Sequence, residues 1–209
     1  MSDLIHSSHA HGVASISIRR PDKKNALTLD MYEGLVSAFE AAESDDEVRV
    51  LLLSGAEGVF TAGNDLLDFM QNPPTGTDSA VFRFLMALGT AEKPLVVAVD
   101  GPAIGIGTTL LLHADLIYAS DRARFQMPFV NLGLVSEGAS SFLLPRLAGN
   151  AKASELLLFG DPFNAETALS NFCRWASLSL GSWGPISTSS VTFPLPKWTS
   201  PKRRSFLKF

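Results

Sequence analysis

Two glycine-containing turns are the residues best suited to chemistry, because each follows a short apolar run and precedes a helical pattern. They are Ala62-Gly63-Asn64-Asp65 and Gly105-Ile106-Gly107. The first amides of a helix have no acceptor within it, so they can bind an anionic oxygen. If the amides of Asn64 and Ile106 converge, they would stabilise a carbonyl oxygen as negative charge develops on it, each contributing roughly 10²–10³ in rate. The turns together predict an oxyanion hole.

The residue patterns predict neither a bound cofactor nor a metal. The second turn partly matches a dinucleotide-binding fingerprint, but the third glycine of that fingerprint is missing, so a nicotinamide or flavin site is disfavoured. His6, His9 and His11 share a polar N-terminal segment without a supporting carboxylate, which favours solvated side chains over a metal site. Taken singly, either glycine turn is more often an ordinary strand-to-helix connection, so its interpretation depends on the wider pattern.

The segments that flank these turns carry apolar residues at two spacings, one typical of strands and one typical of helices. Residues 13–18 alternate as in a strand, and residues 29–43 repeat at helical spacing behind Thr28, a good N-cap. Residues 48–53 and 95–99 are short continuous apolar runs, which suit strands buried on both faces. We expect another strand at 116–119 and helices near 79–91, 107–113, 138–147 and 151–159. This order predicts an α/β core with helices packed on a largely parallel sheet.

The composition favours one soluble domain that binds a small molecule. The chain is 46% hydrophobic and 18% charged, which is enough apolar material for one substantial core. A net charge of -4 without a basic stripe gives no reason to expect nucleic acid. The single Cys173 suits a reducing compartment, and neither a secretory signal nor a membrane span is visible. We expect an intracellular protein, cytoplasmic in preference to peroxisomal or mitochondrial.

The chain changes character after Glu166. All 21 acidic residues lie at or before this position, whereas the remainder carries six basic residues and no acid and loses its apolar periodicity. We therefore divide the chain into a flexible N-terminus (1–12), a folded core (13–169), for which the resemblance described next implies acyl-CoA binding, and an atypical tail (170–209). A frame change or alternative exon is the favoured origin of the tail, and a natural extension is the alternative.

The ordered set of motifs resembles the enoyl-CoA hydratase/isomerase superfamily, also called the crotonase family. The resemblance runs from about Val13 to Leu169. Its motifs are Arg20-Pro21 with Asn25-Ala26-Leu27, Phe60-Thr61-Ala62-Gly63-Asn64-Asp65, Lys93-Pro94, Asp100-Gly101-Pro102-Ala103, His113-Ala114-Asp115-Leu116, Phe125 with Pro128, and Leu132-Gly133. The resemblance implies a crotonase-like ββα spiral core whose C-terminal helical region is missing or replaced. It also implies trimers that pair into hexamers, if the tail permits.

The resemblance assigns candidate site residues. Asn64 and Ile106 would supply the oxyanion amides. Coenzyme A would enter as part of the substrate and not as a cofactor. The residues expected near the coenzyme A moiety or the acyl chain are Lys24, Ala26, Ala62, Leu66 and Phe129. Family members usually have glycine at the second oxyanion position, but Ile106 keeps the amide on which the role depends.

The residue types at three positions select among the reactions of the family. Hydratases use two glutamates, and this chain has Thr109 and Phe129 in their places, neither of which is a base near neutral pH. The remaining acid in this part of the sequence is Glu137. An isolated acid before a helix more often stabilises the helix dipole. Its motif, however, resembles the Δ3,Δ2-enoyl-CoA isomerase subgroup, where one glutamate moves a proton from C2 to C4. The alternatives are a catalytically inactive, truncated acyl-CoA-binding form, or another reaction of the family such as enoyl-CoA hydration or thioester hydrolysis.

Overall fold

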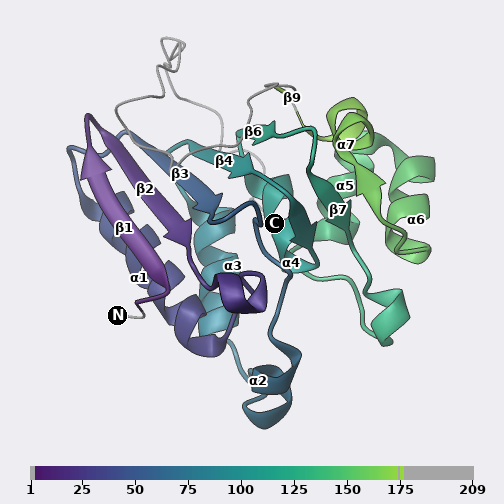
Figure 1. The fold of residues 1–209 in the computed structure, drawn as a ribbon, viewed down its shortest axis with the longest axis horizontal. Helices are drawn as coiled ribbons and strands as arrows, with labels where there is room; N and C mark the ends of the chain where they lie inside the picture. Colours follow the sequence, from purple (N-terminus) through teal and green to yellow (C-terminus); the bar gives the residue numbers. More distant parts are fainter. Residues whose placement is uncertain (1–2, 174, 177–209) are drawn as a thin grey trace.

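A six-stranded β-sheet organises the molecule (Figure 1). The computed structural model describes residues 3–173 and 175–176. The strand order is β1-β2-β3-β4-β6-β9, in which β1 is antiparallel to β2 and every other neighbouring pair is parallel. The strands are β1 Ile5–Ala10, β2 Val13–Ile18, β3 Val50–Gly55, β4 Leu95–Val99, β6 Leu116–Ala119 and β9 Trp175–Ala176. The predicted parallel runs 13–18, 48–53 and 95–99 are thus neighbours.

The N-terminal segment corrects one expectation. Residues 1–12 are predicted to be flexible, but β1 pairs with β2 along its whole length, from Ile5 opposite Ile18 to Ala10 opposite Val13. The strand is hard to recognise because its sequence, IHSSHA, is polar and lies at the sheet edge, where all residues but the first are exposed or half-buried. Without apolar alternation, a pairing that depends on the neighbouring strand leaves little local signal.

Three short strands form a second sheet around the second glycine turn. They are β5 Pro102–Ile104, β7 Arg124–Gln126 and β8 Phe163–Asn164, and β7 lies between the other two. The backbone of the turn is tied to this sheet, because the N–H of Gly105 donates to the carbonyl of Gln126 at 2.9 Å. Phe125 of β7 stacks on Phe163 of β8 with ring centroids 5.6 Å apart. The small sheet therefore holds the second glycine turn in place through β7.

Two helices cover one face of the large sheet, α1 Leu29–Ser44 and α3 Ala80–Thr90 (Figure 1). Thr28 caps α1 as predicted, since its hydroxyl accepts a hydrogen bond from the N–H of Met31. The helices interlock through aromatic rings: Phe84 of α3 meets both Tyr32 and Phe39 of α1 with centroids 5.6 Å apart. This aromatic cluster contacts the first glycine turn through Tyr32, as described below.

The remaining helices confirm the predicted α/β class. They are α2 Leu66–Gln71, α4 Ile106–Thr109, α5 Ser140–Ala148, α6 Asn150–Leu158 and α7 Ala165–Asn171, with short helices η1 Pro21–Lys23, η2 Leu110–His113 and η3 Val130–Leu132. Within the described ranges, no helix is long and apolar enough to cross a membrane. Most of the predicted tail, residues 174 and 177–209, lies outside the described residues, and so does its predicted origin.

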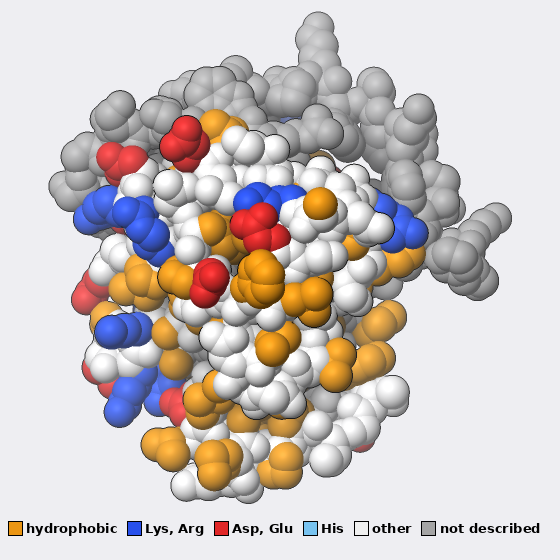
Figure 2. Space-filling model, turned by 90° about the vertical axis from the view of Figure 1, so that its right-hand side faces the viewer, with side chains coloured by type: hydrophobic (Ala, Val, Ile, Leu, Met, Phe, Trp, Pro, Cys, Tyr) orange, Lys and Arg blue, Asp and Glu red, His pale blue; other side chains and the backbone are white. Residues whose placement is uncertain are grey.

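Apolar side chains remain exposed on the face that carries α5 and α6. Figure 2 looks onto this side of the molecule and shows hydrophobic side chains spread over much of it. The exposed apolar residues of α5 and α6 include Phe142, Leu147 and Leu158. Apolar side chains scattered over a surface are common on folded proteins, so this face alone assigns no partner. The expected self-association stays a prediction.

Candidate active site

The two glycine turns lie side by side. Thr61 and Ala103 form an isolated parallel bridge, and the N–H of Ile104 donates to the carbonyl of Thr61 at 3.0 Å. Gly63 has a φ of +89°, and a Cβ atom there would lie 2.9 Å from the carbonyl oxygen of Ile104 and 4.0 Å from Cα of Gly105. Only glycine combines this backbone conformation with so close an approach. The sequence spacing therefore brings the two turns into contact.

The two amides assigned to the oxyanion hole take no part in the backbone hydrogen bonds that hold their turns. Leu27 binds the neighbours of Asn64: its N–H donates to Gly63 and its carbonyl accepts from Asp65, each at 2.8 Å. In a parallel bridge, this pattern directs the Asn64 amide away from Leu27. Ile106 is the first residue of α4, where an amide has no acceptor within the helix. Among the residues that the structure describes, neither amide donates to a protein acceptor.

Glu137 lies against the helix that begins at Ile106. Its Oε1 accepts a hydrogen bond from the hydroxyl of Thr109 at 2.8 Å, and Thr109 is completely buried. Burial raises the pKa of Glu137, while the Thr109 hydrogen bond opposes this rise by favouring the ionised form. The half-buried Glu137 is therefore a carboxylate of increased basicity. It bonds to Thr109, which lies one helical turn after the available amide of Ile106.

The backbone around Glu137 is fixed by its neighbours. The hydroxyl of Ser140 donates to the carbonyl of Glu137 at 2.6 Å, and Nε2 of His113 lies 2.8 Å from the carbonyl oxygen of Gly138. Gly138 and Ala139 have φ of +62° and +54°, so the chain reverses sharply before α5. The carboxylate thus bonds to Thr109 of another helix, while only the carbonyl of Glu137 engages the start of α5. This geometry disfavours the helix-dipole interpretation.

A buried tyrosine, which the sequence interpretation missed, joins the site from below. The hydroxyl of Tyr32 donates to Oδ1 of Asn64 at 2.6 Å, and Tyr32 has no exposed surface. Burial raises the pKa of Tyr32 well above its ordinary value, and the negative charge of Glu137 raises it further. The phenol therefore bonds to Asn64 and is subject to the charge of Glu137. The available signal was a tyrosine within the apolar face of α1, because a buried hydroxyl needs an acceptor.

The remaining predicted site residues fall into two places. Four of them flank the first turn. The carbonyl of Lys24 accepts from the N–H of Ala62 at 3.0 Å, Ala26 precedes the Leu27 bridge, and Leu66 begins α2 with 55% of its surface exposed. Phe129 instead packs in the main hydrophobic core with 7% exposure. The structure brings the first four together, and the coenzyme A contacts of all five stay predictions.

Asp65 has an architectural role beside the first glycine turn. Its Oδ1 accepts from the N–H groups of Leu67 and Asp68 at the start of α2, at 3.1 and 3.2 Å. Its Oδ2 lies 2.7 Å from a guanidinium nitrogen of Arg20. The hydrogen bond from Arg20, and then that from the Asp68 amide, lower the pKa of Asp65. An ionised carboxylate held in this way supports the turn and is a poor candidate for a nucleophile.

The motifs and the fold together define the family. The chain belongs to the enoyl-CoA hydratase/isomerase family, whose model matches residues 8–171. Solved structures agree: OdaA of Pseudomonas aeruginosa is 48% identical with a TM-score of 0.81, over 84% of this chain and 71% of that one. An enoyl-CoA hydratase/isomerase from Pseudoalteromonas atlantica is 43% identical with a TM-score of 0.80, over 83% and 70%. The predicted crotonase-like fold is thereby confirmed.

Three of the named relatives are isomerases. Enoyl-CoA delta isomerase 2 of Homo sapiens is 40% identical over 75% of this chain and 41% of that protein. The peroxisomal enoyl-CoA delta isomerase 3 of Mus musculus is 34% identical over 94% of this chain and 60% of that protein. The chain thus spans less than two thirds of these two curated relatives. A 1,2-epoxyphenylacetyl-CoA isomerase of Escherichia coli is 38% identical over 80% of this chain and 67% of that protein.

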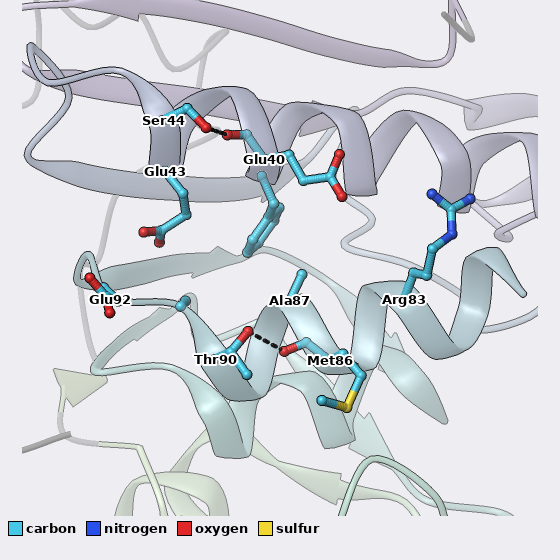
Figure 3. Close-up of a pocket in the computed structure, with 10 residues that line it drawn as sticks. Glu40, Glu43, Ser44, Arg83, Met86, Ala87, Thr90 and Glu92 are labelled. Atoms are coloured by element: carbon cyan, nitrogen blue, oxygen red, sulfur yellow. Dashed lines mark hydrogen bonds between the residues drawn. The ribbon is translucent and has the colours of Figure 1, made fainter. Parts of the chain in front are cut away.

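A groove between α1 and α3 is separate from these turns (Figure 3). It is lined by the carboxylates of Glu40, Glu43 and Glu92, and its cation, Arg83, already pairs with Glu33. An excess of negative charge opposes the binding of the phosphates that coenzyme A carries. The groove shares no residue with the candidate site, so it does not compete with the glycine turns as the expected thioester site.

Proposed function

We propose that this chain is a Δ3,Δ2-enoyl-CoA isomerase, which moves a double bond along the acyl chain of a coenzyme A thioester. The observation that carries the proposal is the pairing of Glu137 with Thr109. Glu137 is then the single acid/base group of the pair, because a threonine hydroxyl does not titrate near neutral pH, whereas hydration uses two carboxylates. The two isomerase relatives support the same reaction class.

Glu137 would serve as base and then as acid in one cycle. Its carboxylate takes a proton from C2 of a 3-enoyl thioester, and the electron pair of the broken C–H bond forms a dienolate whose charge reaches the thioester oxygen. The carboxylic acid then returns the proton to C4, so the double bond ends between C2 and C3. No proton, electron or water is gained or lost overall. Burial raises the pKa of Glu137, which strengthens its carboxylate as a base.

The amides of Asn64 and Ile106 would bind the thioester oxygen during this transfer. Negative charge grows on that oxygen only as the C2 proton leaves, so donors aimed at it stabilise the dienolate more than the substrate. Loss of one such donor costs roughly 10²–10³ in rate. Substitution of a side chain there leaves the amide in place, which accounts for the tolerance of isoleucine at position 106.

The test is to supply a 3-enoyl-CoA and to follow the conjugated 2-enoyl thioester by its absorbance. We expect turnover by the wild type and a loss of at least about 10²-fold in Glu137→Gln, since general acid–base groups contribute roughly 10²–10⁴. Glu47→Gln, which removes an exposed carboxylate outside the site, is the matched control and should retain activity. Equal turnover by the wild type and Glu137→Gln would remove Glu137 from the mechanism.

The same assay separates the alternative reactions. Thioester hydrolysis releases a free thiol that a thiol reagent detects, and hydration consumes a 2-enoyl thioester instead of producing it. Binding of a non-reactive acyl-CoA without turnover of any substrate would identify an acyl-CoA-binding form. Light scattering would measure whether trimers or hexamers form. The intracellular location stays a prediction, with fractionation of a tagged chain as its measurement.

A further inference from the structure

Tyr32 is held from three sides beneath the first glycine turn. The residue belongs to α1, and its ring meets Phe84 of α3 with centroids 5.6 Å apart and Phe69 of α2 with centroids 6.2 Å apart. The side chain is completely buried, so its hydroxyl has little freedom to move. That hydroxyl donates to Oδ1 of Asn64 at 2.6 Å. Packing among three helices therefore determines where the Asn64 side chain is anchored.

The anchor completes the fixation of the Asn64 peptide. The flanking groups of Gly63 and Asp65 are both hydrogen-bonded to Leu27, each at 2.8 Å. Two attachments to one residue fix a line, about which the intervening peptide can still tilt. The bond from Tyr32 to the Asn64 side chain adds a third point, off that line, and so fixes the tilt. The direction of the Asn64 amide is therefore restrained by this third point as well as by the bonds to Leu27.

The charge of the proposed base also acts on this phenol. The charge of Glu137 reaches Tyr32 strongly enough to raise the pKa of the phenol, in addition to the larger effect of burial. Both effects keep the phenol protonated, so Tyr32 remains a hydrogen-bond donor throughout the working pH range. Tyr32 thus bonds to the residue that carries one amide of the site, and the charge of the carboxylate that would move the proton acts on its phenol.

We infer that Tyr32 is a positioning residue that acts through Asn64: its hydroxyl aims the Asn64 amide at the thioester oxygen and sets the distance between that oxygen and Glu137. The inference rests on the proposed isomerase function for its chemistry. Misplacement of a reacting group by about 1 Å can cost roughly 10²-fold in rate, so a single buried hydroxyl is sufficient to matter.

The first experiment removes this hydroxyl and keeps the ring. In Tyr32→Phe, we expect kcat to fall about tenfold, the value of one well-placed hydrogen bond, with KM changed less than about twofold. The second readout is binding of a para-dimethylaminocinnamoyl-CoA, whose absorption moves to longer wavelength when its carbonyl is polarised. We expect this shift to shrink. The control is Tyr118→Phe on β6, the other tyrosine of the chain, which packs against a separate apolar cluster.

A double-mutant cycle tests the route through Asn64. Asn64→Ala removes the acceptor, keeps the backbone amide and leaves the aromatic cluster intact, so it also serves if Tyr32→Phe folds poorly. We expect each single variant and the double variant to show the same loss in kcat and in the spectral shift. Multiplying losses would overturn the inference, because Tyr32 would then act independently of Asn64. Wild-type values in Tyr32→Phe with only a lower Tm would overturn it too, as a purely structural role.

The two readouts separate this inference from the isomerase proposal. If the wild type shows the spectral shift but does not isomerise a 3-enoyl-CoA, the isomerase proposal fails, and a smaller shift in Tyr32→Phe still supports the positioning role. If the wild type isomerises and Tyr32→Phe matches it in kcat and in the shift, only the positioning role fails. A wild type without any shift on binding would overturn the inference, since the site would then polarise no carbonyl.

Discussion

Replacement of Thr109 by valine should change the pH at which the proposed base becomes active. Thr109→Val keeps the buried shape but removes the hydroxyl that donates to Glu137 at 2.8 Å. Hydrogen bonds to charged groups contribute about 1.5–3 kcal/mol, and the lower end applies because Glu137 is only partly buried. About 1.5 kcal/mol corresponds to roughly tenfold in an equilibrium or a rate. The ionised form of Glu137 should therefore be disfavoured about tenfold further.

The sign of this effect follows from the two causes that act on Glu137. Burial raises the pKa of Glu137 and the Thr109 hydrogen bond lowers it, so the valine variant should have a still higher pKa. Below that pKa, kcat/KM should fall about tenfold, because fewer molecules carry an ionised base. Above it, both proteins are fully ionised and their rates should converge. The measurement is the pH profile of kcat/KM with a 3-enoyl-CoA.

Two outcomes would refute this reasoning. An acidic limb that stays in place or moves to lower pH would show that the hydroxyl does not favour the ionised carboxylate. A rate that falls equally at every pH would indicate general damage to the site. Thr90→Val is the matched control, because its exposed hydroxyl donates to a carbonyl of its own helix, α3, away from the site. It should leave the profile unchanged.

Three further predictions concern stability and the turns. Because burial raises the pKa of Glu137, the folded chain binds more protons than the unfolded chain at pH values between the ordinary and the raised pKa. The free energy of unfolding therefore falls as pH rises through that range. Glu137→Gln should raise Tm in thermal melts, most clearly above that range. Gly63→Ala should cost about 1–3 kcal/mol in urea unfolding and roughly 10² in turnover, whereas Gly89→Ala, in open space on α3, should add about 0.5–1 kcal/mol. The hydrogen bonds that lower the pKa of Asp65 stabilise the fold at pH values above the unfolded-state pKa, and this stabilisation is lost as pH falls through the lowered pKa. The urea midpoints of wild type and Asp65→Asn should therefore differ at neutral pH and converge in acid.

Local signals account for most of the predictable fold. Thr28 announces α1 because its hydroxyl can cap the first turn, and the apolar run 95–99 becomes the fully buried strand β4. The hairpin of β1 was missed because its polar residues face solvent and its pairing depends on β2. Short-range patterns therefore predict elements with a buried face, and they fail where an element is defined by its partner alone.

The site divides along the same line. Gly63 and Gly105 are recognisable because turns of this kind need glycine, so the oxyanion hypothesis could be built from the sequence. The hydrogen bond from Thr109 to Glu137 spans 28 positions, and that from Tyr32 to Asn64 spans 32. No local pattern predicts such pairs, because they arise from how helices pack. The sequence therefore indicated which groups could react, and the fold shows what holds two of them.

Two features near Glu137 lower stability: the carboxylate is partly desolvated, and Ala139 has a left-handed φ of +54°. Gly138 between them leaves room for Thr109, because a Cβ atom there would lie only 3.1 Å from the Thr109 hydroxyl oxygen. A left-handed alanine and a desolvated acid each cost free energy that a different local sequence would avoid. Such costs persist where the surrounding structure enforces them, and they concentrate at functional sites. Here the reversal at Gly138 and Ala139 directly follows Glu137, whose carboxylate bonds to Thr109. The strained backbone and the burial that raises the pKa of Glu137 therefore occur together at one place in the chain.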